Sequence, residues 1–349
     1  MTLLDSMQEL GYGEVYVRHH KPSGLNAIIG IHNTHLGPAL GGCRLAAYPD
    51  HAAAMQDALR LAKGMTYKAA LAGLDHGGGK AVILEPSGEF DRQALFLAFG
   101  QMVQQLGGRY YTAEDSGTTP SDMQTIRSVT PYVTGATMGL GGSGDPSPYT
   151  ALGVRRGIEA CVKFALAKDT LAGLHICVQG IGSVGYHLCK ELHALGARLT
   201  VADRRTERTE RVATEFQATV VPITEIAEIQ CDVFAPCAFG GVVNDISLPK
   251  LKCRIIAGAA NNQLAKEQHG DALEKQGIVY APDYAINAGG LINVAQELKG
   301  YDADVSRQRT LKIYDTIWTI LQESQRTGIP PHRIADHLAE NRLESANIV

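Results

Sequence analysis

The sequence predicts an α/β protein with two domains, an amino-terminal α/β domain followed by a doubly wound, parallel-sheet domain of the Rossmann type. The length of 349 residues corresponds to about two domains at roughly 150 residues each. After residue 150, strands and helices alternate regularly, which is the pattern of a parallel sheet covered on both faces. Between the two halves, residues 139–150 contain four glycines, two prolines and two serines, a composition typical of a linker or hinge.

The composition excludes several classes of function. The 32 basic and 36 acidic residues leave a net charge of −4, which is too mild to predict nucleic acid or an anionic membrane as a partner. No apolar run reaches about 18 residues, so we expect no membrane span. The seven cysteines are odd in number, and no two have CxxC spacing, so we expect neither a disulfide framework nor a metal site. Free thiols favour a reducing cytoplasm.

The amino-terminal half mixes apolar strands, glycine-rich segments and amphipathic helices. Its predicted elements are a strand over 24–31, a break at LGPALGG (36–42), a helix over 52–73, a glycine run at 77–79 that leads into the strand KAVIL, a helix over 90–106 and a strand over 108–115. We expect this first domain to cover residues 1–138.

The second half has the pattern of strands and helices that is typical of a doubly wound sheet. Its predicted elements are a helix over 152–166, strands over 175–180, 198–203 and 231–237 with helices between them, two further strands over 254–260 and 278–284, and helices alone over 305–347. We expect the second domain to cover 139–325, and the C-terminal helices over 326–349 to be able to pack back on the first domain.

The segment GIGSVG predicts a dinucleotide site because of its context. Gly180, Gly182 and Gly185 follow a predicted strand and open a predicted helix that begins at Ser183 and Val184. The three glycines would provide a tight turn, close approach of the backbone to a pyrophosphate, and close packing of helix on strand. The helix N-terminus offers unpaired N–H groups to the phosphates. The alternative is a structural turn that binds nothing.

The end of the following strand indicates which dinucleotide would bind. Asp203 lies eighteen residues beyond Gly185, where a carboxylate accepts hydrogen bonds from the ribose and repels a 2′-phosphate. This favours NAD over NADP. Arg204 and Arg205 complicate the prediction because an arginine at this place can bind a 2′-phosphate, although both are equally typical of a solvated surface.

Two lysines and an aspartate are the candidates for chemistry. Lys80 leaves a run of three glycines as an apolar strand begins, and glycines let backbone and ligand come close. Burial and a second cation would lower the pKa of Lys80 and let it act as a base. Lys68 lies late in a helix, where an ordinary surface lysine is the simpler interpretation. Asp115 closes a strand and suits either a pocket rim or the cap of the helix predicted from Thr119.

Six segments resemble the amino-acid dehydrogenases of the glutamate/leucine/phenylalanine/valine group. They are GMTYKAALAGLDHGGGKAVI, RYYTAEDSGTT, GGSGDPSPYTALGV, VQGIGSVGYHL, AGAANNQL and APDYAINAGGLINV. The resemblance runs from about Asn26 to about Tyr314. It implies oxidative deamination of an L-amino acid with NAD⁺ to a 2-oxo acid, ammonia and NADH. It also implies a homo-oligomer, a dimer or an octamer, with the first domain serving substrate binding and oligomerisation.

The resemblance also implies a role for each matched residue. Lys68 would hold the substrate carboxylate, helped by backbone N–H groups of a Gly41–Gly42 turn. Lys80 would activate the attacking water, and Asp115 would carry protons to and from the amino nitrogen. Asn262 would lie near both the substrate and the nicotinamide, and Thr150 is expected at the cofactor.

The specificity pocket expected from the resemblance is apolar. It would be formed by Leu40, Ala113, Leu291 and Val294. None of the four is charged, which argues against glutamate as the substrate. Leu40 and Ala113 follow the leucine-specific pattern, whereas Leu291 resembles the aromatic-specific members. We therefore expect leucine, valine and isoleucine as substrates, with phenylalanine or tryptophan as the alternative.

Two other functions are alternatives to an amino-acid dehydrogenase. A non-catalytic Rossmann protein would need only the glycine turn, so the intact set of Lys68, Lys80, Asp115 and Asn262 argues against it. A hydroxy-acid dehydrogenase would need a histidine paired with a carboxylate as its base rather than two lysines.

Overall fold

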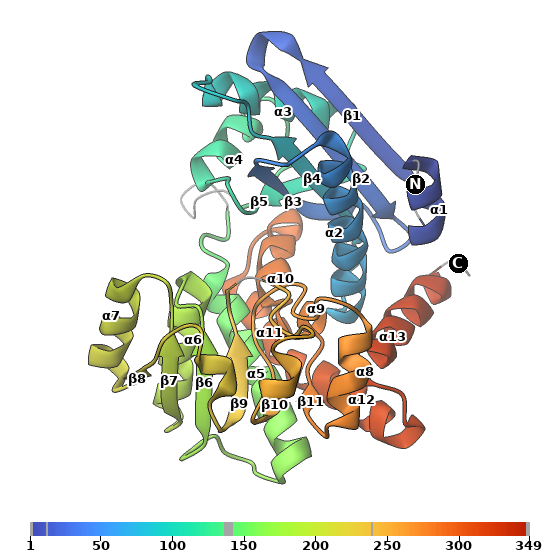
Figure 1. Ribbon diagram of the computed structural model, residues 1–349. Coiled ribbons are helices and arrows are strands. Elements are labelled where there is room, and N and C mark those ends of the chain that lie inside the picture. The colour runs from blue at the N-terminus through green and yellow to red at the C-terminus, as the bar shows by residue number, and fades with distance from the viewer. Residues whose placement is uncertain (1–2, 12, 136–141, 239, 347–349) are drawn as a thin grey trace. The chain divides into compact units, whose positions relative to one another are not determined.

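The computed structural model describes residues 3–11, 13–135, 142–238 and 240–346 (Figure 1). The chain divides into two compact units. The first comprises residues 1–145, 294–303 and 339–349, and the second comprises 146–293 and 304–338. The boundary expected at 138/139 lies outside the described residues. Part of the expected linker is helical, because α5 begins at Ser147 and runs to Leu166.

The first unit is built on a five-stranded mixed sheet in the order β1-β2-β4-β3-β5. β1 and β4 pair antiparallel with β2, while β3 pairs parallel with both β4 and β5. The strands are β1 (Glu14–His20), β2 (Leu25–Asn33), β3 (Ala39–Ala46), β4 (Gly77–Leu84) and β5 (Tyr110–Glu114). The helices before residue 130 are α1 (Leu3–Leu10), α2 (His51–Leu71), α3 (Arg92–Gln105) and α4 (Pro120–Arg127). The predicted break over 36–42 is wrong in its second half, because β3 begins at Ala39.

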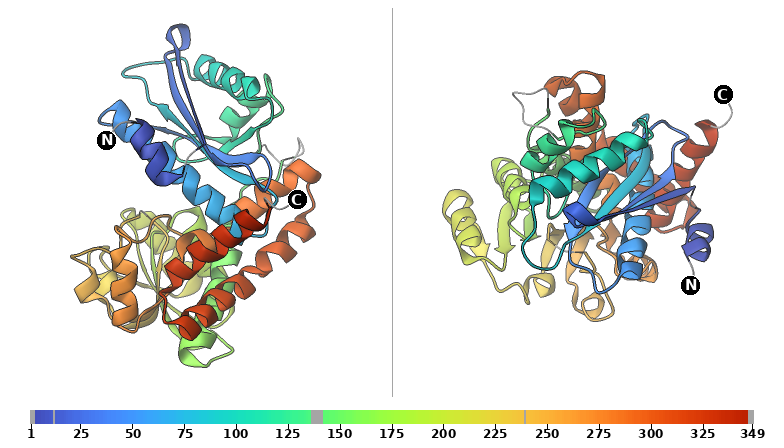
Figure 2. Two further views of the ribbon diagram at one scale, coloured as in Figure 1. Left: turned by 90° about the vertical axis from the view of Figure 1, so that its right-hand side faces the viewer. Right: turned by 90° about the horizontal axis from the view of Figure 1, so that it is seen from above.

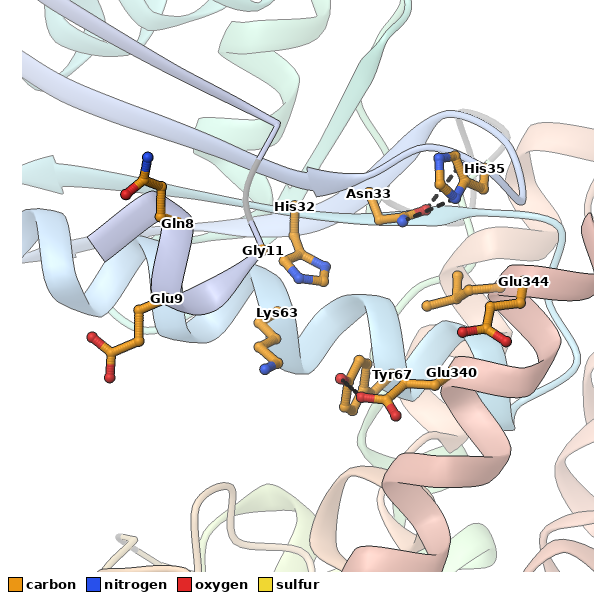
Figure 3. A pocket seen from close by; sticks show the side chains of 11 residues that line it. Gln8, Glu9, Gly11, His32, Asn33, His35, Lys63, Tyr67, Glu340 and Glu344 are labelled. Atoms are coloured by element: carbon orange, nitrogen blue, oxygen red, sulfur yellow. Dashed lines mark hydrogen bonds between the residues drawn. The ribbon is translucent and has the colours of Figure 1, made fainter. Parts of the chain in front are cut away.

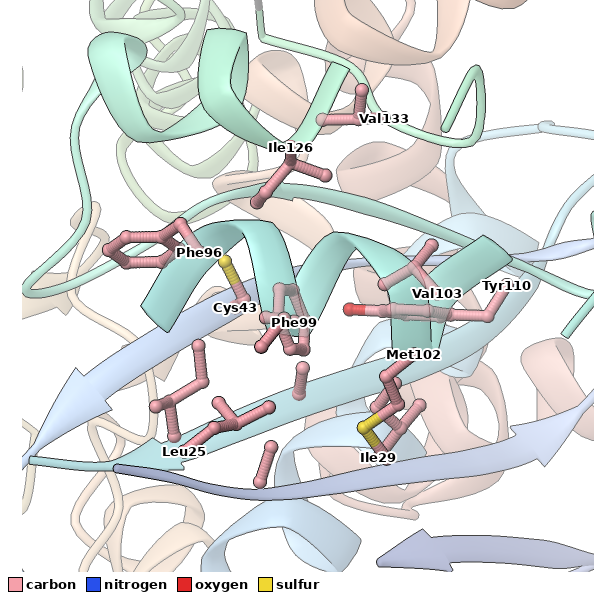
Figure 4. Close-up of a cluster of buried hydrophobic side chains, with 14 of the residues drawn as sticks. Leu25, Ile29, Cys43, Phe96, Phe99, Met102, Val103, Tyr110, Ile126 and Val133 are labelled. Carbon is pink, nitrogen blue, oxygen red and sulfur yellow. The ribbon is translucent and has the colours of Figure 1, made fainter. Parts of the chain in front are cut away.

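Helices α2 and α3 cover opposite faces of this sheet (Figures 1 and 2). On the α3 face, Phe96 and Phe99 pack with Tyr110 and Cys43 from the strands, all of them fully buried (Figure 4). On the α2 face, small residues such as Ala54 and Ala58 let the helix lie close to the sheet. Asp50 and Asp91 cap α2 and α3 by accepting backbone N–H bonds. The sheet therefore has a thick apolar core on one face and a closely packed helix on the other.

The second unit is a doubly wound sheet of six parallel strands in the order β11-β10-β9-β6-β7-β8. The strands are β6 (His175–Gln179), β7 (Arg198–Ala202), β8 (Thr219–Val220), β9 (Cys231–Pro236), β10 (Cys253–Ile256) and β11 (Val279–Tyr280). The helices are α5, α6 (Ser183–Ala194), α7 (Thr206–Phe216), α8 (Gln268–Lys275) and α9 (Asp283–Ile286). The strand order reverses between β6 and β9, and in open α/β sheets ligands bind at the carboxyl ends of strands at such a point.

The last part of the chain is helical, as predicted. Its helices are α10 (Gly289–Gln296), the 3-10 turn η5 (Glu297–Lys299), α11 (Ala303–Leu311), α12 (Ile313–Thr327) and α13 (Pro331–Ser345). α12 packs against α5 within the second unit, whereas the end of α10, η5 and the end of α13 belong to the first. There Tyr67 on α2 donates a 2.7 Å hydrogen bond to Glu340. Among the described residues, no helix is both long and apolar enough to cross a membrane.

Candidate functional site

The first unit gathers several predicted residues on one face of its sheet. β3 lies between β4 and β5, and the strand register places Gly42 beside Ala113 on one side and Lys80 on the other. Because side chains alternate along a strand, these positions share a face with Val82, whose side chain packs against α2. Lys80, Asp115 and the helix that carries Lys68 therefore lie on the same side of the sheet.

Lys80 and Asp115 form a close ion pair across β3. The Nζ atom of Lys80 lies 2.7 Å from Oδ2 of Asp115, and the two side chains are 7% and 20% exposed. Asp115 does not cap the next helix, because the cap of α4 is the Thr119 hydroxyl, with Asp122 closing a capping box. The helix predicted from Thr119 is confirmed, and the alternative interpretation of Asp115 as its cap is wrong.

Two glycines of β3 make room for this pair. Gly41 and Gly42 lie inside the strand, so the turn expected there is wrong. A Cβ atom on Gly42 would lie 2.7 Å from Cβ of Asp115, and one on Gly41 would lie 1.8 Å from the carbonyl oxygen of Gly79. Both distances are shorter than real Cβ contacts, so both positions require glycine. The absence of a side chain at Gly42 lets Asp115 fold over β3 toward Lys80.

Arg44 is a second cation at Asp115, and sequence reasoning missed it. Its Nε atom lies 3.2 Å from Oδ2 of Asp115, and its Nη1 donates at 2.9 Å to Asp57. Tyr48 donates a 2.6 Å hydrogen bond to the same Asp57 oxygen. Burial alone would raise the pKa of Asp115, but Lys80 and Arg44 together outweigh it, and the pKa of Asp115 is lowered. Asp115 is therefore held as a carboxylate.

The glycine run before Lys80 serves packing within the protein. A Cβ on Gly78 would lie 2.1 Å from the backbone nitrogen of Thr66, and one on Gly79 would lie 2.7 Å from the Tyr110 ring. Gly78 thus lets α2 lie directly on β4, and Gly79 makes room for Tyr110 in the core on the other face. Both roles differ from the close approach of a ligand that the sequence suggested. Lys68 follows Thr66 by two residues on α2 and is half-buried.

The four apolar positions of the expected specificity pocket are all buried. Leu40 on β3 is 1% exposed and Ala113 on β5 is 7% exposed. Leu291 and Val294 lie one turn apart on α10 and are each 8% exposed. Leu40 and Ala113 lie on the Lys80 face of the sheet, because they share the parity of Gly42 in the register. Buried aliphatic side chains at these positions offer an apolar surface.

In the second unit, GIGSVG forms a strand-turn-helix, as predicted. Gly180 has φ +95°, a left-handed conformation that favours glycine. A Cβ on Gly185 would lie 2.0 Å from the carbonyl oxygen of Gly180, whereas one on Gly182 would have only the Nη1 atom of Arg208 within 4 Å, at 3.9 Å. Gly180 and Gly185 are thus required by the fold, and Gly182 leaves open space in front of the α6 N-terminus, where Ser183 and Val184 begin the helix.

Asp203 holds the same turn from the end of β7. Its Oδ2 accepts a 2.6 Å hydrogen bond from the N–H of Ile181, and its Oδ1 accepts from the N–H of Arg205 at 2.9 Å. A carboxylate offers about four acceptor sites, so capacity remains for a ligand. The Nη1 atom of Arg208 lies 3.8 Å from Oδ2. Arg208 is a further cation at this turn that the sequence prediction did not include.

Asn262 and Thr150 lie at other parts of the second unit. Asn262 has φ +52°, and its carbonyl oxygen accepts the N–H of Gly241 at 2.7 Å. The other two described non-glycine residues with positive φ, Ala167 and Gln217, end helices, whereas Asn262 does not. A left-handed non-glycine residue that does not end a helix is a candidate functional position. Thr150 donates from Oγ1 to the carbonyl oxygen of Pro146 at 3.1 Å.

A separate polar cavity of about 370 Å³ lies between β2, α2 and the end of α13 (Figure 3). It is lined by Gln8, Glu9, Gly11, His32, Asn33, His35, Lys63, Tyr67, Glu340, Leu343 and Glu344. The Tyr67–Glu340 hydrogen bond closes one side of it. None of the predicted site residues lines this cavity. No cluster of His, Cys, Asp and Glu within the described parts of the chain could hold a metal ion.

Comparisons with known proteins cover nearly the whole chain. Residues 13–132 match the family profile described as Glu/Leu/Phe/Val dehydrogenase, dimerisation domain, and residues 199–347 match that of Glutamate/Leucine/Phenylalanine/Valine dehydrogenase. The chain is 50% identical to the leucine dehydrogenase of Bacillus cereus over 345 residues, which cover 99% of this chain and 94% of that protein. It is 43% identical to the valine dehydrogenase of Streptomyces coelicolor over 349 residues, with coverage of 99% and 95%. The crystal structure of L-tryptophan dehydrogenase from Nostoc punctiforme superposes with a TM-score of 0.86 at 42% identity, covering 99% of this chain and 100% of that one.

Proposed function

Because the chain belongs to the glutamate/leucine/phenylalanine/valine dehydrogenase family, we propose that it oxidises leucine, valine and isoleucine with NAD⁺. The products are the 2-oxo acid, ammonia and NADH, and the same site carries out the reverse reductive amination. The observation that carries the proposal is the 2.7 Å pair of Lys80 and Asp115 on the face of the sheet that α2 covers.

The two cations and the carboxylate divide the work between binding and proton transfer. Lys68 binds the substrate carboxylate, which a half-buried ammonium attracts strongly. Lys80 orients the water that attacks the imine carbon and takes its proton. Asp115 transfers protons to and from the amino nitrogen, which leaves as ammonia. The fixed spacing of Lys80 and Asp115 supports this assignment. Groups that are already positioned lower the activation free energy, because no translational or rotational entropy is lost in bringing them together.

The proposed cofactor positions lie in the second unit. The open space before the α6 N-terminus fits a pyrophosphate, with N–H groups from Gly182, Ser183 and Val184 as donors. Bound NAD⁺ supplies the acceptor for the hydride that leaves the substrate Cα. Asp203 binds the adenosine ribose and disfavours a 2′-phosphate. Asn262 and Thr150 are proposed to bind near the nicotinamide.

The substrate side chain is proposed to contact Leu40, Ala113, Leu291 and Val294. Their burial and aliphatic character support a branched-chain substrate, because an apolar surface favours an apolar group. A second candidate is an aromatic amino acid. It is favoured by Leu291, which resembles the aromatic-specific members, and by the likeness to the Nostoc tryptophan dehydrogenase.

We propose a homo-oligomer, a dimer or an octamer, and a cytoplasmic location. The name of the first family profile, a dimerisation domain, supports the oligomer. The seven cysteines are all free, which is typical of a reducing compartment. Sedimentation velocity on the purified chain tests the oligomer, and a monomer at micromolar concentration would contradict it.

The test of the function is NADH formation with leucine, valine, isoleucine, phenylalanine, tryptophan and glutamate at alkaline pH. We expect the highest kcat/KM with the branched-chain acids. A preference for phenylalanine or tryptophan would support the second candidate instead. Absence of turnover with the whole panel would refute the amino-acid dehydrogenase assignment for this chain.

A further inference from the structure

A buried carboxylate outside the proposed chemistry binds Gly135 and Ser143, two residues that follow β5 in the chain. Glu297 begins η5, directly after α10, and its side chain is 3% exposed. It accepts hydrogen bonds from the N–H of Gly135 at 3.1 Å and from the N–H of Ser143 at 2.8 Å, and it also accepts the Ser143 hydroxyl at 2.5 Å. Arg127 Nη2 lies 3.7 Å from its Oε2. Three donors and a cation thus surround one carboxylate.

The backbone that Glu297 holds is paired to β5. Thr134 donates its N–H to the carbonyl oxygen of Thr112 at 2.9 Å, and Thr112 donates to the carbonyl oxygen of Tyr132 at 3.1 Å. Gly135, the residue that Glu297 binds, packs beside Glu114, because a Cβ on it would lie 3.7 Å from the Glu114 nitrogen. Glu297 is therefore joined to β5 on both sides of Ala113.

The other end of this connection is α10, the helix that carries Leu291 and Val294. Val294 lies one turn before Glu297, and helix rise over three residues is only about 4.5 Å. Lys299, at the end of the same turn η5, pairs with Asp75 at 3.0 Å, but both of these side chains are largely exposed, so their ion pair adds little. Glu297 is thus a buried contact between the turn that follows α10 and the backbone that is paired with β5.

We propose that Glu297 is a positioning residue for substrate specificity. It fixes the distance between Val294 on α10 and Ala113 on β5, and with it the size of apolar side chain that fits between them. This inference rests on the proposed function, because it assumes that Val294 and Ala113 contact the substrate.

The first test is Glu297→Gln, which keeps the shape but removes the charge and places the amide NH2 against Arg127 and the N–H of Gly135. The end of α10 should move away from β5, so the site should widen. We expect the ratio of kcat/KM for phenylalanine to that for valine to rise about tenfold, a size typical of one methylene in an apolar pocket. The Kd for NADH should stay unchanged. Glu323→Gln, which removes an acid from the exposed pair with Arg326 on α12, is the control and should leave the ratio as it was.

A merely structural role would lower kcat/KM for all substrates by the same factor, and that result would overturn the inference. Val294→Ala provides a further readout. If Glu297 acts through Val294, the ratio in the double variant should differ from the product of the two single effects, and simple multiplication would count against the proposal. Should Glu297→Gln fail to fold, Ser143→Ala removes one donor, keeps the charge and should shift the ratio in the same direction by less.

The two proposals fail in distinguishable ways. An unmutated chain that oxidises no amino acid would refute the proposed function. An active chain whose phenylalanine-to-valine ratio is the same with Glu297→Gln would refute only the role of Glu297.

Discussion

Asp115 and Lys80 come from strands that are not neighbours, yet their charged atoms lie 2.7 Å apart. The strand between them, β3, carries glycine at the crossing point, where a Cβ would lie 2.7 Å from Cβ of Asp115. Arg44 approaches the same carboxylate oxygen from the far end of β3. The candidate chemistry therefore depends on glycine at position 42 as much as on the charged side chains of Lys80, Asp115 and Arg44.

Replacing Lys80 with alanine should reduce turnover by several orders of magnitude, because the group that activates water and pairs with Asp115 is lost. NADH binding should be nearly unchanged, since the proposed cofactor positions belong to the second unit. Steady-state kinetics and a fluorescence titration with NADH would measure the two. Unchanged turnover would remove the proposed mechanism.

Replacing Arg44 with methionine should move the acidic limb of the kcat/KM profile to higher pH. The pKa of Asp115 is lowered because Lys80 and Arg44 outweigh the effect of burial, so losing one cation raises that pKa. The carboxylate is then lost at a higher pH than in the parent. Arg92→Met, which breaks a different pair, with Asp122, is the matched control. An identical shift in both variants would contradict a specific action of Arg44 on Asp115.

Adding one methyl group should act oppositely at two glycines. Gly42→Ala places a Cβ within 2.7 Å of Asp115 and should lower both kcat and the thermal midpoint. Gly64→Ala, on α2 where nothing lies within 4 Å of the added carbon, should stabilise the fold by about 0.5–1 kcal/mol through helix propensity. Thermal melts and NADH-linked assays of both variants check this. A fully active Gly42→Ala would show that the crossing tolerates a side chain.

Replacing Asp203 with asparagine should raise the kcat/KM for NADP⁺ relative to that for NAD⁺. The negative charge that repels a 2′-phosphate is removed, while Arg208 remains close enough to attract it. The thermal midpoint should fall, because Ile181 and Arg205 donate to different carboxylate oxygens and the NH2 group that replaces one of these oxygens cannot accept an N–H bond. Kinetics with both cofactors decide the matter, and an unaltered preference would argue against Asp203 as the selecting group.

The sequence predicts best those features that depend on neighbours along the chain. The turn from Gly180 to Gly185 and the helix that opens at Ser183 follow from local spacing, and they are present as predicted. The Gly41–Gly42 turn was predicted wrongly, since a glycine pair has the same local signature inside a strand as in a turn. Only the register of β3 with β4 and with β5 shows that the requirement for glycine arises from Gly79 and Asp115.

Contacts between distant segments were beyond sequence reasoning. Arg44 stands two residues after the glycine pair, a spacing that offers a weak signal for a charged group on the same face as Gly42. No local sequence signal marks Glu297, because the N–H groups that it binds, of Gly135 and Ser143, lie more than 150 positions earlier in the chain. A buried carboxylate bound to backbone N–H groups can be recognised only once the fold brings them together.

The final turns of the chain also complete one of its earliest helices. Arg342 donates to the carbonyl oxygens of Ala70 and Leu74, at and just beyond the end of α2, the helix that carries Lys68. During translation, Arg342 is added to the chain about 270 residues after those carbonyl groups. The contact between Arg342 and the end of α2 can therefore form only after the second unit has been synthesised. Loss of the last dozen residues would thus damage the proposed carboxylate-binding end of α2, which is far from them in the sequence.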